Sequence, residues 1–186
     1  MHPFRHRFFL ITAAMLSAMS NAQTLDFTDT QIVEQMWVVN DGVMGGVSQS
    51  RVRHSAEGVI IEGNVSLENN GGFASVRSAA AFSVGTAVLE LKIKGDGKRY
   101  KFILRTDPSP RSPMYQADFV TTEAWSVYRF VPQNFRVSFR GRAVDAPAVV
   151  FADVKELGIL ISDKQAGSFR VHLQNIRALS DAKAKQ

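Results

Sequence analysis

The sequence predicts an all-β fold in which short antiparallel strands pack as a sandwich. About ten or eleven strand-like segments follow one another at intervals of roughly 8–15 residues, which is typical of sandwiches and barrels. None of them shows the sustained apolar periodicity of an amphipathic helix. The 186 residues suffice for one domain with a sizeable core but not for two, so we expect a single domain over 23–179.

Alternation of apolar and polar residues defines the expected strands. In the segment 86–94, Leu89, Leu91 and Ile93 alternate with charged residues, as in a strand with one buried face. The same reasoning applies to the other segments. The expected strands are 24–27, 48–55, 58–67, 73–78, 86–94, 99–106, 114–121, 124–131, 135–140, 156–162 and 169–179.

Few segments depart from this pattern. The polar residues 28–30 form a turn or a helix cap, which makes 29–35 a helix candidate, and the tail after Leu179 is the other candidate. Three prolines in 107–113 lack the N–H group that a central strand needs, so this segment is expected to be an exposed loop. The Ala- and Lys-rich end, 180–186, is expected to be frayed.

The stretch 37–48, WVVNDGVMGGVS, is rich in residues that bend the chain. Its glycines permit positive φ or a close backbone approach, while Asn40 and Asp41 can bond their own backbone and fix a turn. We expect a shaped loop that crosses the sheet edge, with Trp37 or Met44 closing the end of the core. The glycines match neither of the phosphate-binding patterns, which argues against a nucleotide site.

A second stretch of this kind is 63–77, GNVSLENNGGFASVR. In it, Asn69-Asn70-Gly71-Gly72 separates the strand-like segments 64–68 and 73–77. Because Asn-Gly is a strong signal for a tight hairpin, the sequence predicts that these two segments pair with each other.

Together with a third stretch, GILISDKQAGSF at 158–169, these motifs resemble the complex I intermediate-associated protein 30 family over roughly 26–176. The resemblance implies a galactose-binding domain-like jelly-roll β-sandwich, a fold that some carbohydrate-binding modules also use. It further implies an assembly-factor or chaperone-like role for NADH:ubiquinone oxidoreductase, the respiratory complex I. In that role the sandwich holds a partner protein while the complex is built.

The first 22 residues have the layout of a secretory signal peptide. Arg5 and Arg7 precede an apolar stretch, 8–19, and small residues stand before the cut expected ahead of Gln23. A mitochondrial transit peptide is the alternative, but such peptides are amphipathic whereas 8–19 is apolar throughout. No later stretch approaches the roughly 20 apolar residues of a membrane span. We therefore expect an exported, periplasmic protein.

Composition excludes several kinds of site. Removing the two arginines of the leader lowers the net charge from +5 to +3, which leaves 20 basic against 17 acidic residues. The basic residues are scattered along the sequence, so we expect no nucleic-acid partner. Cysteine is absent, which excludes disulfides, thiol nucleophiles and thiolate metal sites.

Residues suited to catalysis are sparse. After the leader only His54 and His172 remain, and neither belongs to a pattern typical of a Ser-His-Asp relay or a zinc site. A facing pair of carboxylates, as in glycoside hydrolases, is the remaining catalytic alternative. Sequence spacing cannot show whether two acids approach each other, and acids on strands are more often solvated or in ion pairs, so we expect a protein without catalytic activity. The acids that could supply such a pair are Asp41, Glu68, Asp118, Glu123 and Asp163.

A structural calcium ion is an alternative to the absence of any cofactor. Jelly rolls of this type often hold one Ca²⁺ in a loop, and calcium prefers hard oxygen ligands. No EF-hand-like spacing is present, and turn formation accounts equally well for these residues. The candidate oxygen donors are Asp26, Asp29, Asn40, Asp41 and Asp163.

Polar residues at alternate strand positions predict a shallow polar cleft on the concave side of the sandwich. Arginine in such a cleft grips planar oxygens with two N–H groups and stacks on rings. The alternative is that Arg77 and Arg105 form internal ion pairs with acids such as Asp118. The candidate cleft residues are Ser75, Arg77, Arg105, Tyr115 and Gln116, with Asp41 and Asn69 at the rim.

These observations favour a binding protein that holds a partner on this cleft, and the resemblance implies respiratory complex subunits as that partner. The alternative function is glycan binding on the same face. Sugar sites on sandwiches usually present an aromatic ring to the pyranose, and Tyr115 is the expected platform.

Overall fold

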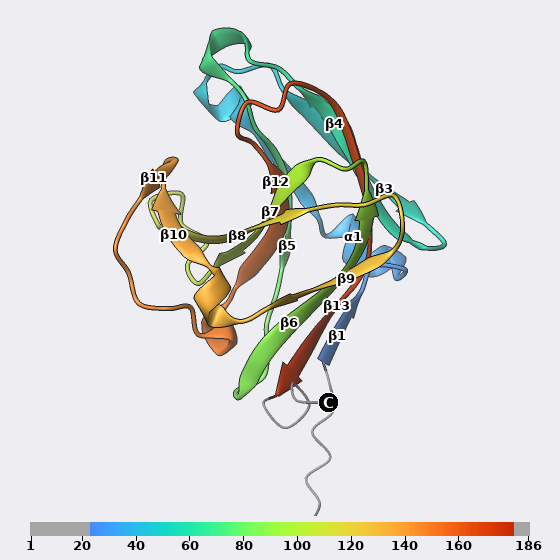
Figure 1. Cartoon of the computed structure of the whole chain (residues 1–186), viewed down its shortest axis with the longest axis vertical. Helices are drawn as coiled ribbons and strands as arrows, with labels where there is room; N and C mark the ends of the chain where they lie inside the picture. Colours follow the sequence, from blue (N-terminus) through green and yellow to red (C-terminus); the bar gives the residue numbers. More distant parts are fainter. Residues whose placement is uncertain (1–22, 181–186) are drawn as a thin grey trace, which may run out of the picture.

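The computed structural model describes residues 23–180, which form two antiparallel sheets packed face to face (Figure 1). The expected antiparallel sandwich is confirmed. The six-stranded sheet has the order β3-β4-β13-β6-β9 with β1 also paired to β13, and the seven-stranded sheet has the order β11-β10-β8-β7-β12-β5-β2. The expected signal peptide, 1–22, and the end of the expected frayed or helical tail, 181–186, lie outside the described residues.

Every expected strand is present within a few residues of its predicted bounds, and the structure adds β2 and β11. The six-stranded sheet consists of β1 (Gln23–Asp26), β3 (Gln49–Ser55), β4 (Gly58–Val65), β6 (Thr86–Gly95), β9 (Ser126–Phe130) and β13 (Gly167–Ser180). The seven-stranded sheet consists of β2 (Trp37–Asn40), β5 (Ala74–Ala79), β7 (Arg99–Arg105), β8 (Met114–Val120), β10 (Arg136–Phe139), β11 (Arg142–Ala143) and β12 (Glu156–Ile161).

Helical structure in the described residues is limited to short turns. The helix candidate at 29–35 is confirmed as α1 (Thr30–Glu34), where the carboxylate of Asp29 caps the helix by accepting the Gln31 N–H at 2.9 Å. Within 23–180, no helix is both long and apolar enough to cross a membrane. The 3-10 turns are η1 (Asp41–Met44), η2 (Glu68–Asn70), η3 (Pro132–Asn134) and η4 (Phe151–Asp153).

The core lies between the two sheets and is built from the alternate residues that face inward. From β7 it receives Tyr100, Phe102 and Leu104, each at most 1% exposed. The ring of Phe102 lies 5.3 Å from that of Phe130 and 5.9 Å from that of Phe135. Burying one such side chain stabilises the fold by about 1.5–3 kcal/mol, so these strands hold the sheets together without any disulfide.

The predicted hairpin at Asn69–Gly72 is wrong. Strand β4 pairs with β3 and β13, whereas β5 pairs with β12 and β2 in the other sheet. Asn69 and Asn70 do turn the chain, with φ of 53° and 59°. A turn signal fixes the local reversal but not the partner of the strand that follows, and here the chain crosses from one sheet to the other.

The stretch 37–48 is also only partly a loop. Its first four residues form the edge strand β2, which pairs with β5, and the rest forms η1 and the approach to β3. The expected closing of the core by Trp37 or Met44 does not occur, because these side chains are 36% and 67% exposed. Trp37 lies on an edge strand and Met44 in the 3-10 turn that follows it, where fewer neighbouring elements cover a side chain.

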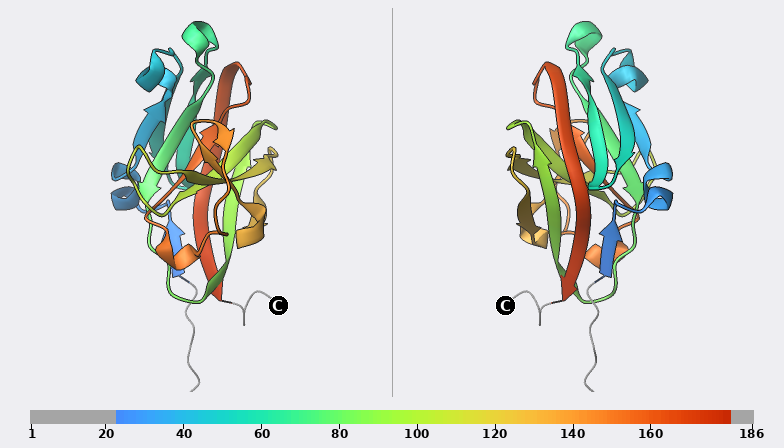
Figure 2. Two further views of the ribbon diagram at one scale, coloured as in Figure 1. Left: turned by 90° about the vertical axis from the view of Figure 1, so that its left-hand side faces the viewer. Right: turned by 90° about the vertical axis from the view of Figure 1, so that its right-hand side faces the viewer.

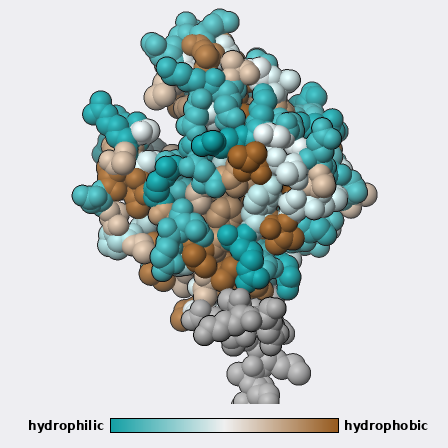
Figure 3. Space-filling model, in the orientation of Figure 1, coloured by the Kyte–Doolittle hydropathy of each residue, from teal (hydrophilic) through white to brown (hydrophobic). Residues whose placement is uncertain are grey.

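The sandwich presents two broad outer faces. Figure 2 shows β13, in red, running the length of the six-stranded sheet. In Figure 1 the outer face of the seven-stranded sheet lies between the upper loops, which contain η1 and η2, and the β10–β11 end. In the same orientation, Figure 3 shows the molecular outline hollowed between those two ends.

Candidate functional site

The outer face of the seven-stranded sheet carries most of the predicted cleft residues. Directly paired residues of antiparallel strands point to the same side of a sheet. Because Val76, Phe102 and Ile159 belong to the core, their neighbours along each strand face outward. One outward row, read across the sheet, is Trp37, Arg77, Gly158, Ile103, Gln116 and Arg136.

One part of this face is occupied by Lys101 and three charged neighbours. Two of these are acidic, Asp118 and Asp163, and one is basic, Arg136. Lys101 Nζ lies 3.0 Å from Asp118 Oδ1 and also contacts Asp163, while Arg136 contacts the other oxygen of Asp118. Lys101 itself is only 7% exposed. Burial alone would raise the pKa of Asp163, but the hydrogen bond and charge of Lys101 outweigh it, so that pKa is lowered.

A second charged group surrounds Glu156. The Glu156 carboxylate lies 3.6 Å from Arg105 Nε and 3.9 Å from an Arg77 terminal nitrogen. Burial, and then the nearby charge of Arg105, lower the pKa of Arg77, and Glu156 opposes that effect. Within the described residues, Arg77 Nε and Glu156 Oε2 are buried without a hydrogen-bond partner. This group therefore has hydrogen-bonding capacity that the fold does not use.

Arg105 also fixes the proline-rich loop that borders the face. Its Nε donates to the Asp107 carbonyl at 3.3 Å, and a terminal nitrogen donates to the Ser109 carbonyl. The side chain is only 6% exposed. The two arginines therefore form ion pairs, with Glu156 rather than with Asp118, and Arg105 acts as an internal clamp while Arg77 lines the face.

The remaining predicted residues have different positions. Ser75 lies on the outer face but is buried, and its Oγ donates to the Val39 carbonyl at 2.6 Å, which ties down β2. Gln116 faces outward in the row of Arg77. Tyr115 points to the opposite side of β8 and packs against the core. It is therefore not placed to serve as the expected sugar platform.

Asp41 and Asn69 join the two motif loops to each other. The fully buried carboxylate of Asp41 accepts hydrogen bonds from Ser48 N (2.9 Å), Ser48 Oγ (2.5 Å), Gly72 N (2.7 Å) and Phe73 N (3.2 Å). Asn69 Nδ2 donates to the Gly45 carbonyl at 3.2 Å. These residues shape the loops above the face, and they leave little of Asp41 for a ligand.

Sequence reasoning missed several residues of this face. Trp37 was expected in the core, yet it stands at the end of the outward row beside Arg77. The predicted cleft did not include Lys101 or Glu156. Alternation along β7 and β12 nevertheless places both side chains on the face opposite the core residues. Their charge was a usable signal, because a charged residue within a central strand needs a nearby partner.

The side-chain oxygens of the candidate calcium ligands take part in hydrogen bonds and ion pairs of the fold, including those of Asp26 with Thr28 and of Asn40 with Ser50. The oxygens of Asp41 are occupied by N–H and O–H donors, Asp29 caps α1, and Asp163 pairs with Lys101. Within 23–180, no group of three or more His, Cys, Asp or Glu side chains is arranged to hold a metal ion. Calcium also takes backbone and amide oxygens as ligands, so a structural calcium ion stays a prediction for this chain.

Comparison with known proteins identifies the family. The pattern of the complex I intermediate-associated protein 30 (CIA30) family matches residues 25–173. Among proteins of curated function, no match was found.

Several solved structures with a similar fold are carbohydrate-binding modules. The family 11 module of the cellulosomal cellulase Lic26A-Cel5E of Clostridium thermocellum has a TM-score of 0.62 at 12% identity, with 86% of this chain and 95% of that chain covered. The same module in complex with a beta-1,3-1,4-mixed-linked tetrasaccharide gives 0.60 at 13% identity, with the same coverage. A family 29 module gives 0.51 at 10% identity, covering 86% of this chain and 92% of that one. At these identities the similarity shows the fold alone.

Proposed function

The chain belongs to the CIA30 family, and from this premise we propose that it is a non-catalytic binding protein that holds a partner protein on the outer face of its seven-stranded sheet. The observation that carries the proposal is the array of fixed charges on that face. Lys101 and Arg105 are nearly buried and held by carboxylates, while Arg136 and Asp163 extend from the array into solvent.

Such an array suits recognition of a folded or extended protein segment. Complementary charges across an interface set orientation and exclude wrong partners. Trp37 adds a half-exposed aromatic side chain at the edge of the array, and tryptophan and arginine are the residues most enriched at the energetic centres of interfaces. On this face the charged groups would therefore select the partner, and Trp37 would supply the apolar contact that holds it.

The family supports a role in assembly of respiratory complex I, so we take subunits of that complex as the partner class. The N-terminal leader supports an exported, periplasmic location. We propose on this basis that the partner is a segment of a complex subunit exposed on the outer side of the membrane.

Glycan binding on the same face is the second candidate. It is favoured by the Clostridium thermocellum module, which shares the fold and has been seen with a mixed-linked tetrasaccharide. Trp37 replaces Tyr115 as the side chain able to stack on a sugar ring, with Arg77 and Gln116 following it along the row. The centre of the face is charged rather than aromatic, and for this reason we rank glycan binding second.

The two candidates are separated by affinity purification of the tagged protein from its native cells. We expect complex I subunits to co-purify with the unaltered protein and to be lost with Trp37→Ala. Trp125→Ala is the matched control and should retain them, because Trp125 lies just before β9 and packs beside His172 of the six-stranded sheet. Binding to a mixed-linked glucan that is lost in Trp37→Ala, without co-purifying subunits, would establish the glycan candidate instead. If Trp37→Ala changes neither readout, the seven-stranded face is not the binding site.

A further inference from the structure

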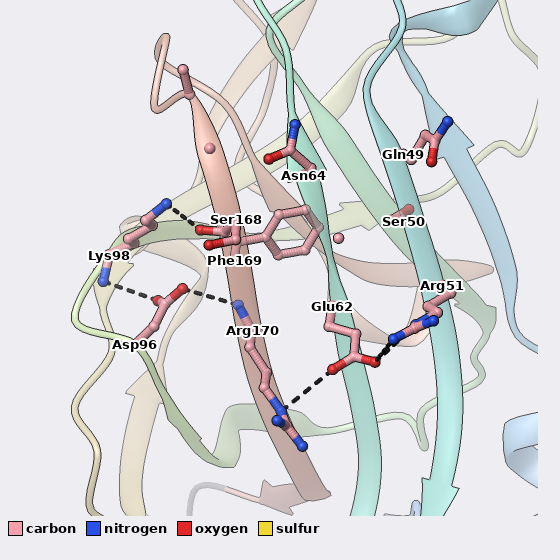
Figure 4. Close-up of a pocket in the computed structure, with 13 residues that line it drawn as sticks. Gln49, Ser50, Arg51, Glu62, Asn64, Asp96, Lys98, Ser168, Phe169 and Arg170 are labelled. Carbon is pink, nitrogen blue, oxygen red and sulfur yellow. Dashed lines mark hydrogen bonds and ion pairs between the residues drawn. The ribbon is translucent and has the colours of Figure 1, made fainter.

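The outer face of the six-stranded sheet contains a pocket of about 910 Å³ that the proposed function does not use (Figure 4). It lies over one end of β3, β4 and β13, next to the turn between β6 and β7. Two of its lining residues, Phe169 and Gly63, pair directly across β13 and β4 and lie on the core side of the sheet. The backbone of the sheet therefore forms the floor of the pocket. The side chains that face the pocket are Gln49, Arg51, Glu62, Asn64, Lys98 and Arg170.

One carboxylate, that of Glu62, organises three guanidinium groups, two of which line this pocket. Glu62 Oε1 accepts from Arg51 Nε at 2.8 Å and from Arg53 Nε at 2.9 Å, and Glu62 Oε2 lies 3.5 Å from Arg170 Nε. Figure 4 shows Arg51 and Arg170 reaching Glu62 from opposite sides. Strand pairing places Glu62 directly between Arg51 on β3 and Arg170 on β13. The backbone of the sheet therefore fixes this arrangement.

The arrangement leaves surplus positive charge facing solvent. The Glu62 side chain is 13% exposed, whereas those of Arg51, Arg53 and Arg170 are 71%, 47% and 52% exposed. A guanidinium has five N–H groups, so each arginine keeps donors that Glu62 does not use. The hydrogen bond from Arg53 is the main cause that lowers the pKa of Glu62 to about 2, and the carboxylate therefore holds the arginines at any physiological pH.

A row of neutral polar groups lies beside the arginines. Gln49, Asn64 and Ser168 are paired across β3, β4 and β13. Within the described residues the side-chain amides of Gln49 and Asn64 make no hydrogen bond (Figure 4), so both donors and acceptors remain free. Amides recognise hydroxyl groups, because they donate and accept at the same time.

We propose that this pocket binds an acidic sugar, whose carboxylate is held by Arg51 and Arg170 and whose hydroxyls are held by Gln49 and Asn64. A planar carboxylate matches the paired N–H groups of a guanidinium. Among the described residues, no large exposed apolar side chain lines the pocket, where Ala166 is the exposed apolar residue, so it lacks the anchor that peptide interfaces depend on. The site is separate from the seven-stranded face and does not depend on the function proposed there.

The test is a calorimetric titration of the purified full chain with a short oligogalacturonate. Arg170→Gln should weaken binding about tenfold, because a charge-assisted pair is lost, and Asn64→Ala a few-fold. Arg51→Gln, at the most exposed of the three arginines, repeats the test where folding is least affected. Arg177→Gln, on the same sheet but outside the pocket, is the matched control and should bind normally. A neutral gluco-oligosaccharide of the same length should give no heat.

Three results would overturn the proposal. One is equal binding of the neutral oligosaccharide, which would remove the role of the charge. Another is equally tight binding of inorganic sulfate or polyglutamate, with Asn64→Ala unchanged, which would make the surface a general anion binder. The third is unaltered oligogalacturonate binding in both Arg51→Gln and Arg170→Gln.

Discussion

Replacing Asp41 by alanine should destabilise the fold more than any other single change in the two motif loops. The carboxylate is fully buried and accepts four hydrogen bonds, three of them from backbone N–H groups of Ser48, Gly72 and Phe73. These donors belong to segments that lead into β3 and β5, one strand in each sheet. Asp41 therefore joins the two sheets at this end of the sandwich.

The expected magnitude follows from these contacts. A hydrogen bond to a charged group contributes about 1.5–3 kcal/mol, and a buried donor left without a partner costs about 1–3 kcal/mol. Such contributions do not add fully when the groups share a partner. Removing one partner of a buried charged network typically costs about 3–5 kcal/mol, and we expect Asp41→Ala to lower the free energy of unfolding by this amount. For a domain of this size the midpoint temperature should fall by about 10 °C. Asp41→Asn keeps one acceptor oxygen and should lose about 2–4 kcal/mol.

The pH dependence provides a second measurement. Burial alone would raise the pKa of Asp41, but the hydrogen bonds from Ser48, Gly72 and Phe73 outweigh it and lower the pKa below 3.8. A lowered carboxylate pKa contributes stability that is present above the unfolded-state pKa and is lost as the pH falls through the folded-state value. The gap between the unaltered protein and Asp41→Ala in urea unfolding should therefore be constant near neutrality and shrink below about pH 4. A loss of less than about 1 kcal/mol at neutral pH would refute the reasoning, because the donors would then be satisfied in another way.

Three further predictions concern the same loops, the border of the charged face and the six-stranded sheet. Gly46→Ala should destabilise by about 1–3 kcal/mol because its Cβ would lie 2.4 Å from the Asp41 carboxylate, whereas Gly42→Ala, with no atom within 4 Å, should be neutral; thermal unfolding of both variants checks this. Arg105→Gln removes two bonds to the loop after β7, so hydrogen exchange in that loop should accelerate, and unchanged protection would contradict the clamp. Burial, and then the charges of Lys94 and Arg170, lower the pKa of His172, so the folded state favours the neutral ring. Stability should then decline as pH falls below about 6.5, and His172→Gln should reduce that decline in urea unfolding compared between about pH 7.5 and 5.5.

The strands were predictable from the sequence because alternation is a local property. In a segment such as 86–94, the alternation of neighbouring residues is enough to predict which side chains face the core and which face solvent. The segment forms a strand in the structure. The cap of α1 at Asp29 and the proline-rich loop were readable for the same reason. Strand pairing was not, as the wrong hairpin at Asn69–Gly72 shows. The choice of partner depends on which apolar faces meet across the whole chain.

The sites depended on tertiary structure still more. Trp37 and Tyr115 both look like aromatic strand residues, but the edge position of β2 exposes one and the core retains the other. Glu62 and Arg170 are 108 positions apart and the basic residues look scattered in sequence, yet the pairing of β4 with β13 brings these two within 3.5 Å. Composition and alternation determined that this protein is a sandwich, because they act between near neighbours. Only the packed sheets decided which charges meet, because ion pairs act across strands that are distant in the chain.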